Sequence, residues 1–312
     1  MTLLAGTIAP VFGVMAIGFI AARIGAIGKV GTRRLVLFVF NAAIPTMLLY
    51  RIAAIDFPEQ IEWGFLFAYY AGALVTYATG MACARFIFRR SMAEQAIYGL
   101  GAGFSNTVLL GIPLMASAFG PEATLPVFLI IAFHSATLLP ISVGLLVAGR
   151  RQGGDDAPLR VLRLIVEVLA NPIIVGIVLG LVANAMGVVF PGPLDAFAGF
   201  MATVAIPCAL LALGASLAGY PLAGQVRPAS VLAMLKLILH PLIVWVIAVP
   251  VFGLGAPWAP VAVVMAGMPS GAMVYLFGAR YETASSVAAG TVVVSSAVSI
   301  VTLSILLVLM GA

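Results

Sequence analysis

Long hydrophobic runs, separated by short polar or glycine- and proline-containing segments, dominate the chain. Most of these runs reach the roughly 20 residues that a helix needs to cross the hydrocarbon core of a bilayer. The pattern predicts ten such helices and no strands. The predicted spans cover about residues 3–22, 33–50, 63–86, 95–118, 121–148, 161–189, 193–219, 229–252, 258–279 and 284–310.

Composition supports an integral membrane protein. Of the 312 residues, 63% are hydrophobic and only 8% are charged, whereas soluble domains carry about a quarter charged residues. So few charges cannot cover a water-facing surface, which excludes a soluble enzyme. The net charge of +5 does not indicate nucleic-acid binding, because the basic residues form short clusters between hydrophobic runs and no basic face.

The distribution of basic residues predicts the orientation of the chain. Cytoplasmic loops of membrane proteins are enriched in lysine and arginine. With both chain ends outside, 14 of the 15 basic residues fall on the cytoplasmic side and Arg51 is the exception. We therefore expect a multi-pass protein of the cytoplasmic (inner) membrane with both termini extracytoplasmic. The longest predicted loop, residues 150–160, is too short for an extramembrane domain.

The two halves of the chain resemble each other. The first and sixth spans share a proline and two glycines at an offset of 162, namely Pro10, Gly18 and Gly25 against Pro172, Gly180 and Gly187. Residues 43–49 match residues 205–211 at the same offset, and residues 111–113 match 267–269 at an offset of 156. Five spans separate the copies, so the halves 1–150 and 160–312 have opposite orientations. Such inverted repeats are typical of secondary transporters.

Proline and glycine interrupt the fourth and ninth spans deep within the membrane. Kinked helices sealed by their neighbours are one interpretation. The other is a pair of broken helices, with breaks at Pro113 and Pro269, whose free N–H groups and positive half-helix ends face an anionic ligand. The predicted substrate-binding residues are Ser105, Asn106, Thr107, Gly111, Pro113, Met268, Pro269, Ser270, Gly271 and Met273.

Four further polar residues inside spans are candidate accessory residues: Asn41, His134, Lys236 and His240. Asn41 could instead satisfy a carbonyl freed by Pro45, and His134 is either a proton relay or a packed, hydrogen-bonded residue. Lys236 either contributes to an anion site or extends to the cytoplasmic surface.

Two polar residues in or near the sixth span have structural interpretations. Asn171 is expected to cap a helix start, although a binding role stays open. Glu167 is expected at the membrane interface.

The sequence carries no metal-ligand, nucleotide-binding or hydrolase motif, so we expect no enzyme, cofactor or metal site. No carboxylate stands at the centre of a span. That argues against cation coupling without excluding it.

Several strings resemble signatures of the auxin efflux carrier family. The most specific is Asn106-Thr107 followed by Gly111-Ile112-Pro113-Leu114 in the fourth span. The other strings are Phe119-Gly120, Asn171-Pro172, Gly180-Leu181, residues 213–217, and Pro269 and Gly271 with Tyr275, Phe277 and Tyr281. The short central loop is similar to that of bacterial members and unlike that of plant PIN-type carriers.

The resemblance implies an all-α fold of ten helices in two inverted repeats, with helices 4 and 9 broken and crossing, as in bile-acid symporters and NhaA-like proteins. It also implies scaffold helices 1, 2, 6 and 7, transport helices 3–5 and 8–10, a homodimer, and anionic substrates such as auxin, malate or malonate. Met273 replaces an asparagine common in bacterial members, and Val274 a proline of plant members, which makes the predicted site more apolar.

The function predicted from the sequence is export of a small organic anion by alternating access. A sodium- or proton-coupled importer of the bile-acid symporter kind is the alternative. A channel or receptor, and a membrane-embedded enzyme, are less favoured. The residues leave the identity of the anion, the coupling ion and the direction open.

Overall fold

A computed structural model describes residues 6, 8–55, 60–149, 166, 170–220 and 225–311. The predicted loop 150–160 and Glu167 lie outside these residues. Six helical segments of the described chain are long and apolar enough to cross a membrane: Lys29–Ala53, Gly64–Ile87, Thr107–Leu146, Gly192–Ala218, Val226–Val251 and Ser285–Leu309. The protein is therefore all-helical, in the part that the structure describes, and of multi-pass membrane type.

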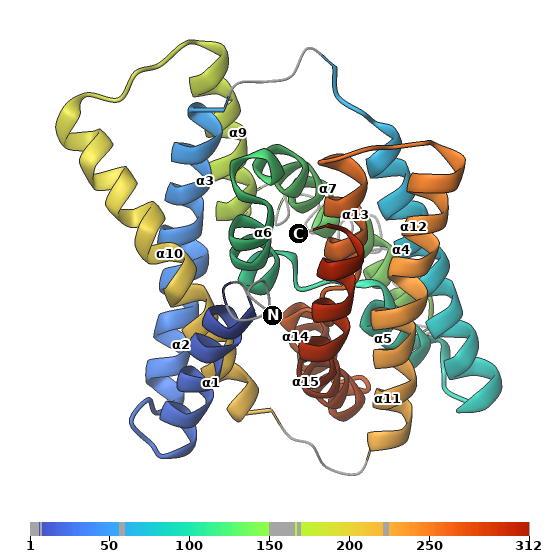
Figure 1. Cartoon of the computed structure of the whole chain (residues 1–312). Helices are drawn as coiled ribbons and strands as arrows, with labels where there is room; N and C mark the ends of the chain where they lie inside the picture. The colour runs from blue at the N-terminus through green and yellow to red at the C-terminus, as the bar shows by residue number, and fades with distance from the viewer. Residues whose placement is uncertain are drawn as a thin grey trace. The chain divides into compact units, whose positions relative to one another are not determined.

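The helices follow the hydrophobic runs of the sequence (Figure 1). In chain order they are α1 (Ala9–Arg23), α2 (Lys29–Phe38), α3 (Ile44–Ala53), α4 (Gly64–Ala82), α5 (Met92–Gly103), α6 (Ile112–Phe119), α7 (Thr124–Gly149), α9 (Pro172–Ala185), α10 (Gly192–Ala218), α11 (Val226–Met234), α12 (His240–Val246), α13 (Trp258–Ala266), α14 (Ala272–Arg280) and α15 (Ser285–Leu309). Charged or turn-forming residues bound most of the runs, and these positions are where the helices end.

The described residues group into two compact units. The first unit takes its residues from Met1–Ile61, Val108–Ala132 and Glu167–Gly219, and the second from Glu62–Thr107, Phe133–Val166 and Tyr220–Ala312. Helices α1, α2, α3, α6, α9 and α10 belong to the first unit, whereas α4, α5 and α11 to α15 belong to the second. The chain of α7 contributes to both units. The scaffold and transport roles of the helices stay a prediction.

Glycines allow close helix packing in the first unit, where α1 lies beside α10 and α3 beside α9 (Figure 1). A side chain on Gly18 of α1 would collide with the backbone carbonyl of Leu211 in α10. A Cβ on Gly180 of α9 would come within 3.1 Å of the carbonyl oxygen of Leu49 in α3. Gly180 and Leu211 follow Gly18 and Leu49 by the same 162 residues, so the two contacts are reciprocal.

Short π-helical segments precede three of the prolines. Val39–Ala43 comes before Pro45, Thr107–Gly111 before Pro113, and Leu235–Leu239 before Pro241. Proline lacks an N–H group and clashes with the carbonyl four residues earlier, and a wider turn relieves that clash. The prediction that the fourth span breaks at Pro113 is therefore wrong, because the helical conformation continues through Pro113.

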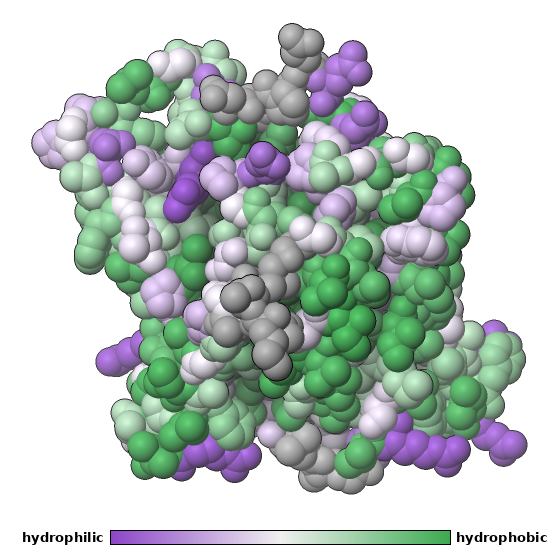
Figure 2. Space-filling model, in the orientation of Figure 1, coloured by the Kyte–Doolittle hydropathy of each residue, from purple (hydrophilic) through white to green (hydrophobic). Residues whose placement is uncertain are grey.

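Figure 2 shows many hydrophobic residues on the surface and fewer strongly hydrophilic ones. On α9 alone, Val175, Val178, Leu179, Leu181 and Val182 are exposed. Contiguous apolar surface of this extent is rare on soluble monomers. It is the surface that a bilayer would cover.

Candidate functional site

The fourth predicted span is interrupted in the second unit. Helix α5 ends at Gly103, and Phe104 takes an extended conformation with φ −88° and ψ 111°. A Cβ on Gly103 would lie 2.9 Å from the carbonyl oxygen of Ala73 in α4, so this close approach requires glycine. The interruption therefore falls at residues 104–106, directly after a glycine that α4 contacts.

The ninth predicted span is interrupted between Ala266, where α13 ends, and Ala272, where α14 begins. Pro269 lies inside this interruption, as predicted. The two interruptions pair as an isolated antiparallel bridge between Ser105 and Ser270. The Asn106 N–H donates to the Pro269 carbonyl at 2.8 Å, and the Gly271 N–H donates to the Phe104 carbonyl at 3.0 Å.

Side chains of neighbouring helices bind backbone groups that the interruptions leave free. The Ser270 hydroxyl donates to the Gly101 carbonyl at 2.7 Å, and the Ser270 N–H donates to the Ser295 hydroxyl at 3.0 Å. Backbone at membrane depth must be satisfied in this way unless it lines a cavity. Both serines are fully buried, so the pairing is internally supported.

His134 of α7 holds the other interruption. Its Nε2 accepts a hydrogen bond from the Ser105 N–H at 2.9 Å, which requires that nitrogen to be unprotonated. The neutral ring then carries its proton on Nδ1, which lies 3.5 Å from the hydroxyl of Tyr69. The geometry matches the packed, hydrogen-bonded interpretation of His134.

Asn106 has an unused donor at the pairing. The residue is only 5% exposed, and its side-chain amide nitrogen makes no hydrogen bond within the described residues. Leaving a buried donor unsatisfied costs about 1–3 kcal/mol, so such a group is suited to a ligand. Ser105 and Thr107 beside it are also buried.

Lys236 is fully buried in the second unit. Its ammonium group donates to the carbonyl of Ala266, the last residue of α13, and lies 3.1 Å from Nδ1 of His240. The lysine therefore does not extend to the surface, and that alternative is not what the structure shows. The contact with Ala266 places the amino group of the lysine at the C-terminal end of a half-helix, where the helix dipole favours a positive charge.

The remaining predicted residues take no part in the hydrogen bonds of the pairing. Gly111 and Pro113 belong to the first unit and are not part of the Ser105–Ser270 pairing, and Asn41, also of the first unit, is exposed. Met268 is buried inside the second interruption, and Met273 is half-buried in the first turn of α14. Asn171 caps α9, because its side chain accepts from the Ile173 N–H at 2.9 Å.

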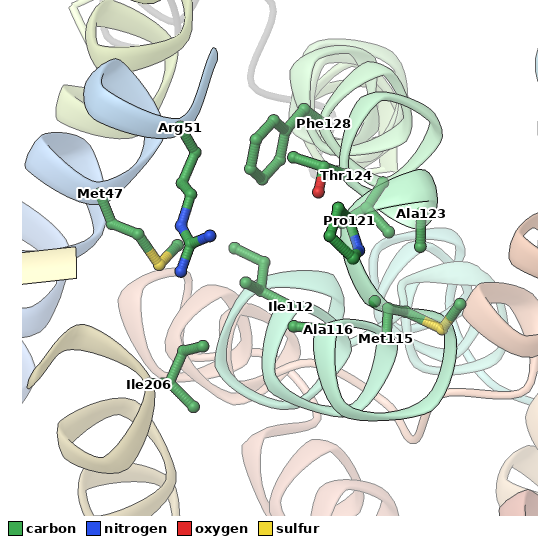
Figure 3. A pocket seen from close by; sticks show the side chains of 12 residues that line it. Met47, Arg51, Ile112, Met115, Ala116, Pro121, Ala123, Thr124, Phe128 and Ile206 are labelled. Carbon is green, nitrogen blue, oxygen red and sulfur yellow. The ribbon is translucent and has the colours of Figure 1, made fainter. Parts of the chain in front are cut away.

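A cavity of about 150 Å³ lies within the first unit (Figure 3). Its wall is mainly apolar, with Met47, Ile112, Met115, Phe128 and Ile206 among the lining residues. Arg51, the one basic residue predicted on the outer side, extends its guanidinium group into the space from α3 (Figure 3). The sequence did not predict this cavity, because its walls come from segments far apart in the chain.

The sequence pattern does not single out several residues that support the pairing. Tyr69, Ser295 and the carbonyls of Gly101 and Ala266 all contact predicted site residues. A serine inside an apolar helix is a signal that could have identified Ser295, because such residues often hydrogen-bond across helices. No local pattern identifies a backbone carbonyl as a partner of a distant lysine.

Comparison with known proteins identifies the family. Residues 3–307 match the family described as "Membrane transport protein". The chain is 26% identical to the "Putative malonate transporter" of Rhizobium meliloti (strain 1021), over 99% of this chain and 96% of the relative. It is also 23% identical to an "Uncharacterized transporter" of Methanothermobacter thermautotrophicus, over 95% of each chain.

The match covers nearly the whole chain, as the resemblance of its sequence strings predicts. The family and the names of both relatives describe membrane transport and no enzyme activity. The chain therefore belongs to the auxin efflux carrier family of membrane transport proteins.

Proposed function

We propose that the protein is a secondary carrier that exports a small organic anion by alternating access, with the anion bound at the Ser105–Ser270 pairing. One observation carries the site assignment: the buried amide nitrogen of Asn106 makes no hydrogen bond within the described residues. Helix α14 begins beside the pairing at Ala272 without a side-chain cap. A helix N-terminus favours an anion, so both features suit a carboxylate.

The proposed architecture is ten membrane spans in two inverted repeats of five. The reciprocal contacts of Gly18 with Leu211 and of Gly180 with Leu49 support it. So do Gly25 and Gly187, which both take positive φ, at 81° and 61°, shortly after α1 and α9 end. We assign a scaffold role to helices 1, 2, 6 and 7, and the transport role to helices 3–5 and 8–10.

The proposed location is the cytoplasmic membrane, with both termini extracytoplasmic. The predicted cytoplasmic side then holds 13 of the 15 basic residues, all except Arg51 and the buried Lys236, in agreement with the positive-inside rule. An inside-negative potential of about 100 mV favours export of each negative charge by about 2.3 kcal/mol. Export of an anion therefore needs no coupled cation.

The proposed substrates are small carboxylates, either auxin-like or dicarboxylic. The printed name of the Rhizobium meliloti relative makes malonate the first probe. The apolar residues Met268 and Met273 near the pairing favour a compact anion whose polar groups are few. A single amide donor and a half-helix end contact the carboxylate without a direct salt bridge, so the anion can also leave.

The test is exchange of radiolabelled malonate, malate and indole-3-acetate by purified protein in proteoliposomes. Asn106→Ala is expected to abolish saturable exchange, because it removes the donor and leaves the backbone pairing unchanged. Thr203→Ala is the control, since Thr203 is exposed on α10 and its hydroxyl bonds the carbonyl of Gly199 in the same helix. Wild-type affinity and rate in Asn106→Ala would refute the site.

The same vesicles separate the alternatives. A sodium- or proton-coupled importer predicts uptake that depends on an imposed sodium or proton gradient. A channel predicts flux without counterflow, whereas a carrier exchanges labelled for unlabelled anion.

A further inference from the structure

We propose that Lys236 is a built-in cation that neutralises one negative charge of the anion while the anion crosses the membrane. The inference rests on the proposed function, and it assigns to this lysine a charge-pairing role in substrate selection. It begins from one observation: the side-chain amino group of Lys236 is enclosed at 0% exposure in the same unit as the Ser105–Ser270 pairing.

The position of the ammonium group is set by two partners. The carbonyl of Ala266 accepts one of its hydrogen bonds, and Nδ1 of His240, one helical turn further along the chain, lies 3.1 Å away. Ala266 ends α13 directly before the interruption that contains Pro269 and Ser270. Carbonyls at half-helix ends are where transporters of this general kind coordinate a cation, and here a lysine side chain reaches that place.

No acidic side chain pairs with Lys236 in the described chain, whose ion pairs include that of Arg90 with Glu94. The segment Leu235–Leu239 packs against α4, α5, α11, α12 and α15. Besides tyrosines, the ionisable residues of these helices are Glu94 on α5, Arg227 on α11 and His240 on α12, and α15 has none. Glu94 lies in the first turn of α5 and pairs with Arg90. His134 of α7 contacts Tyr69.

Burial without a counter-charge disfavours the charged form of the lysine, and an anion placed nearby stabilises that form. A carboxylate at the pairing would therefore be held by the Asn106 amide, by the start of α14 and by the field of Lys236. The lysine would discriminate against neutral analogues of the substrate, because a neutral molecule leaves the ammonium uncompensated.

Because the lysine is part of the carrier, its charge crosses the membrane together with the bound anion. The inference therefore predicts how much net charge moves. Malonate carries two negative charges at a pH of about 7.5, since carboxyl groups ionise near pH 4. A loaded wild-type carrier then moves one net negative charge, and a carrier without the lysine charge moves two. A loss of packing alone would slow transport without changing the charge that moves.

The experiment measures malonate homoexchange in proteoliposomes clamped at a series of membrane potentials, for wild type, Lys236→Met, Lys236→Arg and Lys29→Met. Homoexchange involves only loaded carriers, so its voltage dependence reports their net charge. In Lys236→Met we expect a KM at least tenfold higher. The factor by which 100 mV changes the exchange rate should be roughly the square of the wild-type factor. Lys236→Arg keeps the charge and should keep the wild-type voltage dependence.

Lys29→Met is the matched control, because Lys29 is exposed at the start of α2 in the first unit. It should change neither KM nor voltage dependence at high salt, where exposed charges are screened, whereas the Lys236→Met defect should persist.

Wild-type exchange with unchanged KM and voltage dependence in Lys236→Met overturns this inference alone. Should Lys236→Met fail to fold, altered voltage dependence in the folded Lys236→Arg protein overturns it. Absence of saturable exchange of all three carboxylates by wild type overturns the proposed function and this inference together.

Discussion

Three buried polar side chains in the second unit bind backbone groups at or beside the two interruptions. Ser270 and Ser295 bind a carbonyl and an N–H group, and His134 binds another N–H group. Each polar atom thereby replaces a bond that a continuous helix would have made. Asn106 differs from them in having a free side-chain donor, and Lys236 in having no acidic partner among the described residues.

Removing the Ser295 hydroxyl should destabilise the pairing. Ser295→Ala leaves the Ser270 N–H without its acceptor, and an orphaned buried donor costs about 1–3 kcal/mol. We expect a lower melting temperature in detergent together with slower anion exchange. Ser304→Ala on the same helix is the control, because that hydroxyl bonds the carbonyl of Ile300 within α15. Equal melting temperatures for the two variants would contradict the role of Ser295.

At the scale of elements, two glycines of one helix should respond in opposite directions to alanine. Gly18→Ala places a methyl group against the Leu211 carbonyl, and overpacking of this kind costs about 1–3 kcal/mol. Gly13→Ala meets no atom within 4 Å and should stabilise α1 by up to about 1 kcal/mol, since alanine is the better helix former. Thermal unfolding of the two variants measures whether each substitution raises or lowers the stability. A stabilised Gly18→Ala would show that α1 and α10 do not pack closely.

Helix positions were predictable because charges and turn residues bound the apolar runs. The fourth predicted span shows where that reasoning ends. The sequence predicts a break at the proline, but a π-helical segment precedes Pro113, and the break falls at Phe104. Contacts with other helices, which the local sequence does not show, accompany the break at Phe104. Helix α4 approaches Gly103 closely, and the ring of His134 accepts the Ser105 N–H.

Part of the candidate site was equally predictable. Ser105, Asn106 and Ser270 are polar residues within apolar spans, and such residues are usually functional or bonded to a neighbouring helix. Their partners could not be assigned, because Tyr69, His134 and Ser295 come from separate helices. The alternative for Lys236, extension to the surface, failed because His240 and Ala266 hold the ammonium inside.

At the scale of the whole molecule, we predict a homodimer joined through the helices assigned to the scaffold. These helices expose large apolar side chains, among them Leu179 and Val182 on α9 and Phe197 and Phe200 on α10, which a second copy could cover. Native mass spectrometry in mild detergent should give twice the 32.2 kDa mass of the chain. A monomeric mass under the same conditions would count against the assembly.

The paired glycine contacts of the first unit also bear on how such a chain could arise. Gly18 meets Leu211, and Gly180 meets Leu49, so each half of the chain supplies one glycine and one leucine carbonyl. Two copies of a half-length polypeptide, inserted in opposite directions, would make this contact twice across a twofold axis. Gene duplication and fusion would preserve it, and lysine and arginine accumulated on one side would then fix a single orientation.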